Sequence, residues 1–275
     1  MKEIMSGRGF QLVHLKRVHY TAGHQNGGYP YHLPLFKESF ELSFEAPVTI
    51  LAGENGTGKS TLLESIAQHA GLIRIASAEE QDMNAEIRAF TNHLKITWRA
   101  KTKKGFYLKA DDFLTYARNV SRMRAEAEKR VEEVEEEYRG KSILARQLAA
   151  SPHKKAMAEI QSLYGRGLDN RSHGERFLSF FQSRFRPNGF YLLDEPEGPL
   201  SPMKQLSFIS MLKDMTEEGS QFIIATHSPI LMAFPGAILY SLDEYPVSSV
   251  SYEELEHVKM TRDFLNAPER YLRHL

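Results

Sequence analysis

The sequence GENGTGKST at Gly53–Thr61 decides the fold of this chain. It fits the phosphate-binding pattern G-x-x-x-x-G-K-[ST] without a mismatch. Val48–Ala52, directly upstream, is a short apolar and β-branched run of the kind that forms a buried strand. Downstream, apolar residues recur at helical spacing, at Leu62, Leu63, Ile66 and Ala67. The glycines therefore lie between a strand and a helix, where backbone N–H groups and the positive helix end can hold a triphosphate.

Each residue of the motif has an expected role in binding ATP. We expect Lys59 to reach the β- and γ-phosphates of ATP, and the Ser60 hydroxyl to ligate Mg²⁺. The other positions expected to bind ATP are Gly53, Glu54, Asn55, Gly56, Thr57, Gly58 and Thr61. The alternative is a glycine-rich turn with a lysine nearby. That alternative is disfavoured because the strand and the helix patterns are both in place.

Composition limits the remaining possibilities. The 275 residues are 41% hydrophobic and 25% charged, as in an ordinary globular protein. Because 35 basic residues balance 35 acidic ones, no overall field favours nucleic acid, and any DNA binding is expected to be weak. The absence of cysteine excludes disulfides and thiolate metal sites. No run approaches the roughly 20 apolar residues of a membrane span, so we expect a cytoplasmic protein without a membrane partner.

Alternating apolar and polar residues predict two antiparallel strands ahead of the glycine-rich loop. They cover Phe10–Tyr20 and Glu38–Phe44, and a loop rich in Gly and Pro separates them. Three aromatic residues of this region could stack on adenine or, alternatively, pack in the core: Tyr31, Phe36 and Phe40.

Two further strands are predicted at Leu94–Arg99 and Phe106–Leu108. The turn between them, 101–105, contains three lysines and a glycine, so we expect a hairpin with a basic tip.

The character of the chain changes after Asp111. Residues 117–139 are strong helix formers with charges of alternating sign and a thin apolar seam, which predicts a protruding and mostly exposed helix. Ser151-Pro152 is expected to break the chain before another helix. We therefore interpret 111–164 as a helical subdomain inserted in a single domain that spans 1–275.

A second motif, Phe190–Pro196, is an apolar strand that runs into Asp194 and Glu195. Two carboxylates at the end of a buried strand are costly unless a cation or a donor pairs with them. This cost favours a functional role. We expect Asp194 to hold Mg²⁺ through its water shell and Glu195 to polarise the attacking water.

Ser172-His173-Gly174-Glu175 stands at the start of a predicted helix, upstream of the Asp-Glu motif. A serine, a glycine and a helix start in this order resemble the signature sequence of ATP-binding cassettes, usually Leu-Ser-Gly-Gly-Gln. The resemblance implies that this element reaches across a dimer to the γ-phosphate held by the partner's loop. Glu175 stands in the fifth place of the signature, and a glutamate there resembles the signature of the repair and chromosome-maintenance branch of the family. An ordinary capping box, Ser172 with Glu175 three residues on, is the alternative.

The resemblance to cassettes implies two further site residues. His227, after the strand Gln221–Thr226, stands where cassettes place a switch that senses the γ-phosphate. Gln81 is the only glutamine between the glycine-loop helix and the following strands, and cassettes place a glutamine near here to touch Mg²⁺ and water; a solvent-exposed glutamine is the alternative. Where cassettes have an aspartate in the dimer-contact loop, this chain has Ser201 nearby.

As a whole, the chain resembles a stand-alone, AAA-labelled ATPase of the cassette type, similar to the heads of SMC-like repair proteins and of overcoming-lysogenization-defect nucleases. The resemblance implies an α/β fold with a mainly parallel sheet, an antiparallel β layer on the N-terminal side and a helical insertion. It also implies Mg²⁺-dependent ATP hydrolysis by a head-to-tail homodimer that switches a separate effector in DNA repair, phage defence or toxin control. An energy-coupling subunit of a membrane transporter and a nucleotide-sensing module that only binds partners are the alternatives.

Overall fold

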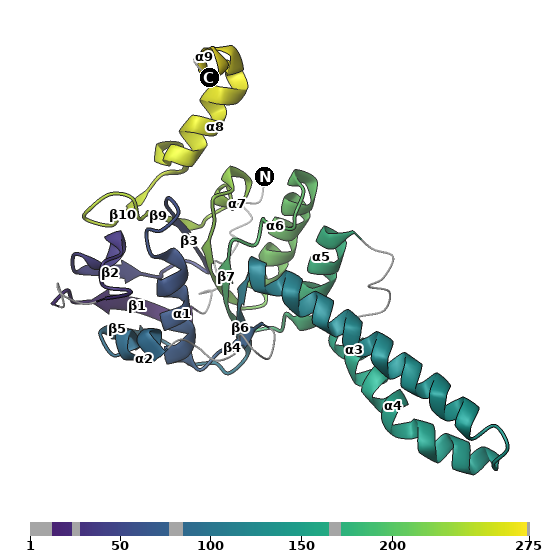
Figure 1. Ribbon diagram of the computed structural model, residues 1–275. Helices are drawn as coiled ribbons and strands as arrows, with labels where there is room; N and C mark the ends of the chain where they lie inside the picture. The colour runs from purple at the N-terminus through teal and green to yellow at the C-terminus, as the bar shows by residue number, and fades with distance from the viewer. Residues whose placement is uncertain (1–12, 24–27, 77–84, 165–171, 274–275) are drawn as a thin grey trace, which may run out of the picture.

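The computed structural model describes residues 13–23, 28–76, 85–164 and 172–273. Figure 1 shows an α/β body, a helical hairpin that projects from it and a C-terminal helix that stands off another side. None of the described helices is long and apolar enough to cross a membrane.

The body is built on a seven-stranded sheet with the strand order β10-β9-β3-β8-β7-β6-β4. All neighbours pair in parallel except β10, which is antiparallel to β9. The strands are β3 (Val48–Ala52), β4 (Ile73–Ile75), β6 (Gly105–Lys109), β7 (Phe190–Asp194), β8 (Gln221–Ala225), β9 (Ile238–Ser241) and β10 (Ser248–Val250). Every residue of β3, β7 and β8 is buried, as parallel strands with both faces covered require.

A three-stranded antiparallel sheet, in the order β2-β1-β5, forms the N-terminal layer. Its strands are β1 (Leu15–Tyr20), β2 (Phe40–Ser43) and β5 (Leu94–Trp98). Val18 of β1 lies opposite Leu42 of β2, so the predicted antiparallel pair is confirmed. The expected fold class is confirmed as well: a mainly parallel sheet with an antiparallel layer beside it.

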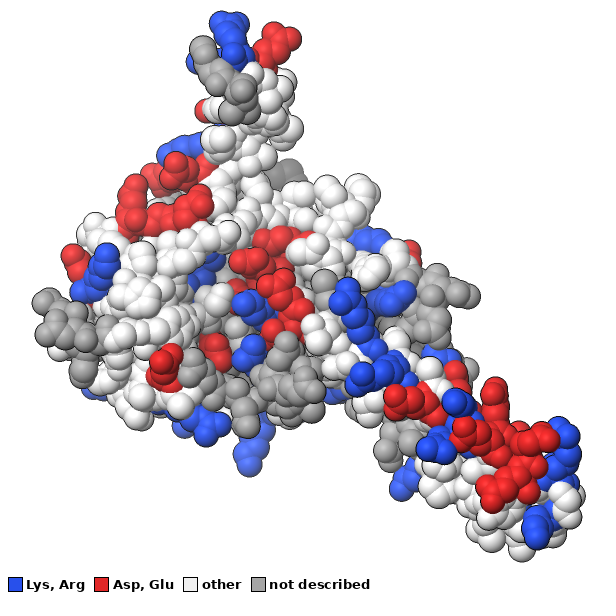
Figure 2. All heavy atoms as spheres, in the orientation of Figure 1, with Lys and Arg blue, Asp and Glu red and all other residues white. Residues whose placement is uncertain are grey.

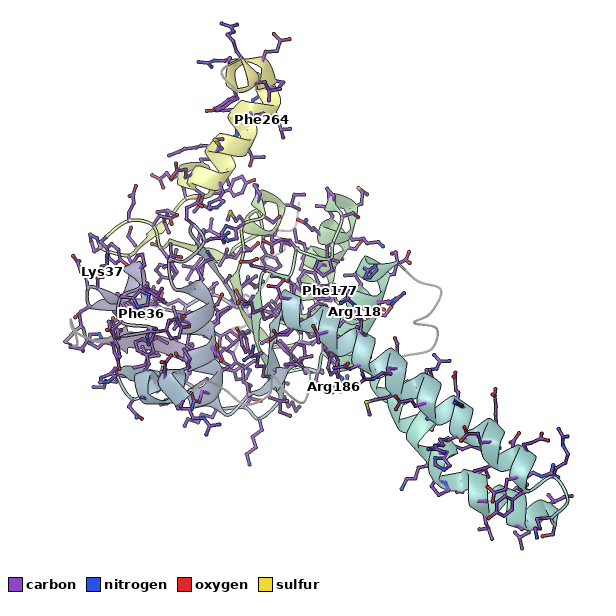
Figure 3. The ribbon with its side chains drawn as sticks, in the orientation of Figure 1. Phe36, Lys37, Arg118, Phe177, Arg186 and Phe264 are labelled. Carbon is purple, nitrogen blue, oxygen red and sulfur yellow. The ribbon has the colours of Figure 1, made fainter. Side chains whose placement is uncertain are left out.

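Helices cover the parallel sheet on both faces, and each face has its own hydrophobic core. One core includes residues of α1 (Lys59–Ala70), α2 (Ala85–Thr91) and the antiparallel sheet. The other includes residues of α5 (His173–Arg184), α6 (Pro202–Glu217) and α7 (Pro229–Met232). Figure 3 labels Phe36, which belongs to the first core, and Phe177, which belongs to the second.

Two of the three candidates for adenine stacking belong to the core. Phe36 and Phe40 are 2% and 7% exposed, and both pack against Tyr20. Phe36 lies in the short 3-10 helix η1 (Pro34–Phe36) and contacts Phe90 edge to face. Tyr31 is partly exposed and also packs on Phe90.

The predicted hairpin of Leu94–Arg99 and Phe106–Leu108 is wrong, because the two strands belong to different sheets. β5 pairs with β1 in the antiparallel layer, whereas β6 pairs in parallel with β4 and β7. The burial patterns give the reason. β5 alternates between covered and exposed positions, but Phe106, Tyr107 and Leu108 of β6 are all buried, as in a strand that is covered on both faces.

Gly105 permits the entry of β6 into the parallel sheet. It lies opposite Phe190 of β7 with φ +135°, a conformation that L side chains rarely adopt. A Cβ at this position would lie 1.7 Å from the carbonyl oxygen of Phe190. The glycine of the predicted turn is therefore a site of close backbone approach between two parallel strands.

The projecting hairpin consists of α3 (Ala110–Glu137) and α4 (Ile143–Tyr164). Acidic and basic side chains lie side by side along it (Figure 2), and Lys154 of α4 pairs with Glu135 of α3 at 2.9 Å. The expected break at Ser151-Pro152 is wrong, because Pro152 lies inside α4. A proline in a helix interior costs about 3 kcal/mol. We attribute its tolerance here to the packing of α4 against α3, which includes the pair of Lys154 with Glu135.

The C-terminal part after β10 is helical. It comprises a 3-10 turn η2 (Tyr252–Glu254), α8 (Glu256–Asn266) and α9 (Pro268–Leu272).

Gly105→Ala is expected to destabilise the protein by several kcal/mol or to prevent folding, because the new Cβ would overlap the backbone of Phe190. Urea unfolding monitored by circular dichroism measures the effect. Gly140→Ala is the matched control, since a Cβ at Gly140 meets no atom within 4 Å. Equal stability of the two variants would contradict the close approach of β6 and β7.

Candidate functional site

The carboxyl ends of β3, β8 and β7 meet at one edge of the parallel sheet. The loop Gly53–Gly58 follows β3 and leads into α1, which begins with Lys59, Ser60 and Thr61. Asp194 ends β7, and His227 lies two residues beyond the end of β8. Residues far apart in the chain, predicted from separate motifs, are thus brought together by strand order.

Lys59 lies inside the loop and is 4% exposed. Its Nζ donates hydrogen bonds to the carbonyl oxygens of Gly53 at 2.6 Å and Glu54 at 2.8 Å. Burial lowers the pKa of Lys59, while the carboxylates of Glu195 and Asp194 act in the opposite direction. The ammonium therefore stands between the loop backbone and the acidic residues at the end of β7.

Further hydrogen bonds fix the loop. The backbone N–H of Glu54 donates to Oδ1 of Asp243 at 2.7 Å, and the Thr57 hydroxyl donates to the carbonyl of Glu54 at 2.9 Å. Gly58 precedes the first residue of α1 with φ +116°, and a Cβ there would lie 3.1 Å from the ring of Phe36. Asn55 and Gly56 are exposed at the turn of the loop.

Asp194 is 1% exposed, and its Oδ1 has no hydrogen-bond partner. Burial raises the pKa of this carboxyl to about 6, while the Ser60 hydroxyl, Lys109 and Lys59 act to lower it. The Tyr107 hydroxyl donates to Oδ2 at 3.4 Å, and its own pKa is raised well above the usual value by burial. A buried carboxylate oxygen without a partner beside a serine hydroxyl suits Mg²⁺, which prefers oxygen ligands. Among the described residues, no cluster of three or more His, Cys, Asp or Glu forms a metal site of its own.

Glu195 has a left-handed backbone conformation with φ +52°, which is unusual for a residue other than glycine. Its N–H donates to the carbonyl of Ala225 in β8, and its carbonyl accepts from Gly198 N–H. These bonds hold the residue in a tight turn at the end of β7. The carboxylate remains accessible, at 45% exposure, and Oε1 lies 3.6 Å from Nε2 of His227.

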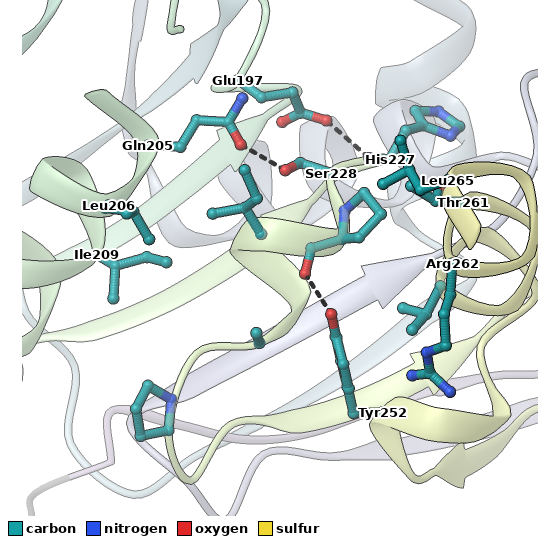
Figure 4. A pocket seen from close by; sticks show the side chains of 15 residues that line it. Glu197, Gln205, Leu206, Ile209, His227, Ser228, Tyr252, Thr261, Arg262 and Leu265 are labelled. Carbon is teal, nitrogen blue, oxygen red and sulfur yellow. Dashed lines mark hydrogen bonds between the residues drawn. The ribbon is translucent and has the colours of Figure 1, made fainter. Parts of the chain in front are cut away.

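His227 is held by two residues from distant parts of the chain, and Figure 4 shows one of them, Glu197. Its backbone N–H donates to Oε1 of Glu197 at 2.7 Å. Its Nδ1 lies 3.0 Å from Nε2 of His257 in α8, and its Nε2 is buried without a hydrogen-bond partner. Burial lowers the pKa of His227, Lys59 adds to that effect and Glu195 opposes it. The lowered pKa favours the neutral imidazole at pH 7.

The segment Ser172–Glu175 begins α5, as expected. The Ser172 N–H donates to Oε2 of Glu175 at 2.8 Å, so the backbone N–H at the N-cap of α5 has a side-chain acceptor. Lys204 of α6 donates to the Ser172 hydroxyl. A Cβ at Gly174 would lie 2.8 Å from the carbonyl oxygen of Pro199, so the glycine permits close packing of α5 on the loop before α6. His173 is exposed at the first position of the helix.

Three contacts were not predicted from the sequence: Glu197 with His227, Asp243 with the loop, and His257 with His227. Asp243 follows β9, which neighbours β3, so strand order could have indicated it. No local pattern marks His257. Gln81, the candidate for contact with Mg²⁺ and water, lies outside the described residues.

Asp194→Asn is expected to stabilise the protein in the absence of nucleotide and metal, and by more at pH 8 than at pH 5. A pKa raised from 3.8 to about 6 means that the folded state binds this proton more tightly than the unfolded state. Stability present at low pH is therefore lost as pH rises through this range. A shift of two pKa units corresponds to about 3 kcal/mol in the free energy of unfolding. About 1 kcal/mol of this stability is lost between pH 5 and pH 8.

Urea unfolding at both pH values measures this difference. Asp214→Asn, which removes an exposed carboxylate from α6, is the control and should change stability little at either pH. An equal effect of Asp194→Asn at both pH values would contradict the raised pKa.

The comparisons with known proteins agree with this arrangement. Residues 175–233 match the AAA_21 family, described as an AAA domain and a candidate AbiEii toxin of a type IV toxin–antitoxin system. Residues 32–70 match the AAA_23 family, described as an AAA domain. The two segments contain the glycine-rich loop and the Asp-Glu and His227 region. No curated protein matches the chain.

Several solved structures match this chain at low sequence identity and TM-scores below 0.5. The SMC head domain from Thermotoga maritima is 16% identical, with a TM-score of 0.43 over 87% of this chain and 100% of that one. The Smc head domain of Pyrococcus furiosus, bound to the C-terminal domain of ScpA, is 15% identical, with a TM-score of 0.44 over 91% and 99%. MJ1267, an ATP-binding cassette of an ABC transporter in its ADP conformation, is 15% identical, with a TM-score of 0.48 over 92% and 98%.

The motif order, the strand order and the matches to two AAA-domain families lead to the same conclusion. Over residues 32–70 and 175–233 this chain is therefore similar to AAA-domain proteins, and it carries the P-loop motif between β3 and α1.

Proposed function

We propose that this protein binds ATP with Mg²⁺ and hydrolyses it slowly, at a site that a second copy of the chain completes. The observation that carries this proposal is the meeting of Lys59, Asp194, Glu195 and His227 at one sheet edge. A lysine ammonium, a buried carboxylate, an accessible carboxylate and a neutral imidazole are groups that phosphoryl transfer to water uses.

The loop and the first turn of α1 bind the phosphates. Backbone N–H groups of the loop and the helix N-terminus attract the anion, and the ammonium of Lys59 neutralises the β- and γ-phosphates. Ser60 and Asp194 would hold Mg²⁺, because the Asp194 carboxylate is buried with one oxygen unpartnered and lies beside the Ser60 hydroxyl. When bound there, the ion would supply charge neutralisation at the phosphate oxygens.

Glu195 and His227 act on the reacting atoms. The exposed carboxylate of Glu195 orients the attacking water and accepts its proton. His227 is neutral, so it can donate one N–H to the γ-phosphate without adding charge. Removal of the γ-phosphate removes this contact, which makes His227 a sensor of ATP against ADP.

A second copy is needed because of where α5 starts. Residues of α1 belong to the core on one face of the parallel sheet, and residues of α5 belong to the core on the other face. The hydrogen bonds of Ser172 run to α5 and α6, through Glu175 and Lys204. In a head-to-tail dimer, the N-terminus of α5 in one subunit meets the triphosphate held by the loop of the other, and ATP joins the two.

Dimer formation on ATP binding, and its loss on hydrolysis, form the switch in this proposal. The hairpin of α3 and α4, within the inserted subdomain 111–164, extends away from the site and offers a surface through which a separate effector protein can follow the state of the dimer (Figure 1).

Glu195→Gln is expected to form a stable dimer in ATP and to remain largely monomeric in ADP, because the amide cannot accept the proton of water and the γ-phosphate contact persists. Light scattering on size-exclusion chromatography measures the change, and ATP turnover should fall at least about 100-fold. A monomer under both conditions would contradict the shared site.

Two controls separate binding from dimer formation. Lys59→Ala should lose ATP affinity in calorimetry and remain monomeric. Ser172→Arg, in the Glu195→Gln background, should bind ATP but not dimerise. Full turnover by monomeric Ser172→Arg in an otherwise unchanged chain would mean that one subunit contains the whole site.

A further inference from the structure

The C-terminal helix α8 contributes a second histidine to the site. Nε2 of His257 lies 3.0 Å from Nδ1 of His227, and the two rings are 5.0 Å apart at an angle of 54°. The same Nε2 lies 3.7 Å from Oε1 of Glu54 in the P-loop. His257 is 15% exposed, and it lies between the loop that holds the phosphates and the histidine that faces Glu195.

These contacts select one arrangement of protons. Two imidazole nitrogens at hydrogen-bond distance require one N–H donor and one bare acceptor. The carboxylate of Glu54 favours the proton on Nε2 of His257, since a carboxylate accepts and cannot donate when ionised. His257 then donates to Nδ1 of His227. The proton of neutral His227 is thereby confined to Nε2.

The Nε2 atom of His227 is the one that faces the reaction. It is buried, has no hydrogen-bond partner and lies 3.6 Å from Oε1 of Glu195. With its proton on Nε2, His227 presents a donor toward Glu195 and toward a γ-phosphate. With its proton on Nδ1, the same ring would present a lone pair and repel the phosphate oxygens.

The helix that carries His257 is anchored to the body at one end only. Leu255 and Val258 are 3% exposed and belong to the core. Further along, Met260 and Leu265 are 54% and 72% exposed, and Figure 3 shows Phe264 on α8, away from the body. The position of His257 therefore depends on the first turn of α8.

We infer that His257 is a positioning residue for hydrolysis: it fixes the tautomer and orientation of His227 and links the C-terminal helix to the nucleotide site. This inference rests on the proposed function. Its consequence is that a displacement of α8 withdraws the N–H donor from His227 Nδ1 and lowers the rate of hydrolysis without changing the binding of ATP.

The tautomer can be measured without turnover. Nitrogen-15 NMR of protein labelled at histidine distinguishes protonated from bare ring nitrogens, and loss of signals in His227→Gln assigns those of His227. We expect the proton on Nε2 in the unchanged protein and a mixture of both tautomers in His257→Leu. A bare Nε2 in the unchanged protein would overturn the inference.

Kinetics provide the second test. His257→Leu should lower kcat about tenfold or more, with KM and the Kd of ATP unchanged. His257→Gln should retain most of the rate, because its amide N–H₂ can donate where Nε2 donated. Lys259→Ala, an exposed change on the same helix, is the matched control and should change neither constant.

The outcomes separate this inference from the proposed function. Equal kcat in His257→Leu and the unchanged protein, or equal losses in the Leu and Gln variants at equal melting temperature, would overturn the role of His257. Absence of hydrolysis in the unchanged protein would overturn the proposed function, and the NMR experiment would still decide the tautomer.

Discussion

Parallel pairing of β3, β8 and β7 is the constraint on which the site depends. Leu51 of β3 and Asp194 of β7 both lie opposite Ala225 of β8, so the three strands end in one row. Chain continuity then requires the P-loop, Glu195 and His227 to leave the sheet within two residues of that row. Backbone bonds extend the pairing beyond the strands, from Thr226 to Leu51 and from Glu195 to Ala225. The positions of the loop, Glu195 and His227 are thus set mainly by the backbone, and side chains refine them.

Much of this arrangement could be predicted from the sequence, because the informative residues are local. The glycine-rich loop, the Asp-Glu pair and His227 each follow a short apolar run, and each run is a strand of the parallel sheet. The first two strands of the antiparallel layer alternate between apolar and polar residues, and this alternation is enough to predict their pairing. The roles assigned to these residues remain predictions that the experiments above test.

The features that were missed depend on contacts between distant parts of the chain. Sequence proximity favoured a hairpin for β5 and β6, but the burial of β6 on both faces places it in the other sheet. The local preference of Pro152 is overridden by the packing of α4 on α3. The contact between His227 and His257 joins residues 30 positions apart, and the residues around them carry no pattern that would indicate it.

The backbone of Glu195 has a consequence for how this protein can change over time. A left-handed conformation at a residue with a side chain costs on the order of 1–3 kcal/mol, whereas glycine adopts it without that cost. Replacement by glycine would therefore be favoured by any pressure for thermal stability alone, and it would remove the carboxylate that faces His227. Stability and the proposed role of Glu195 in hydrolysis oppose each other at this one position. Under the proposed function, a lineage that lost its need for hydrolysis could gain stability here by a single substitution, so the identity of residue 195 in any descendant would record whether turnover is still under selection.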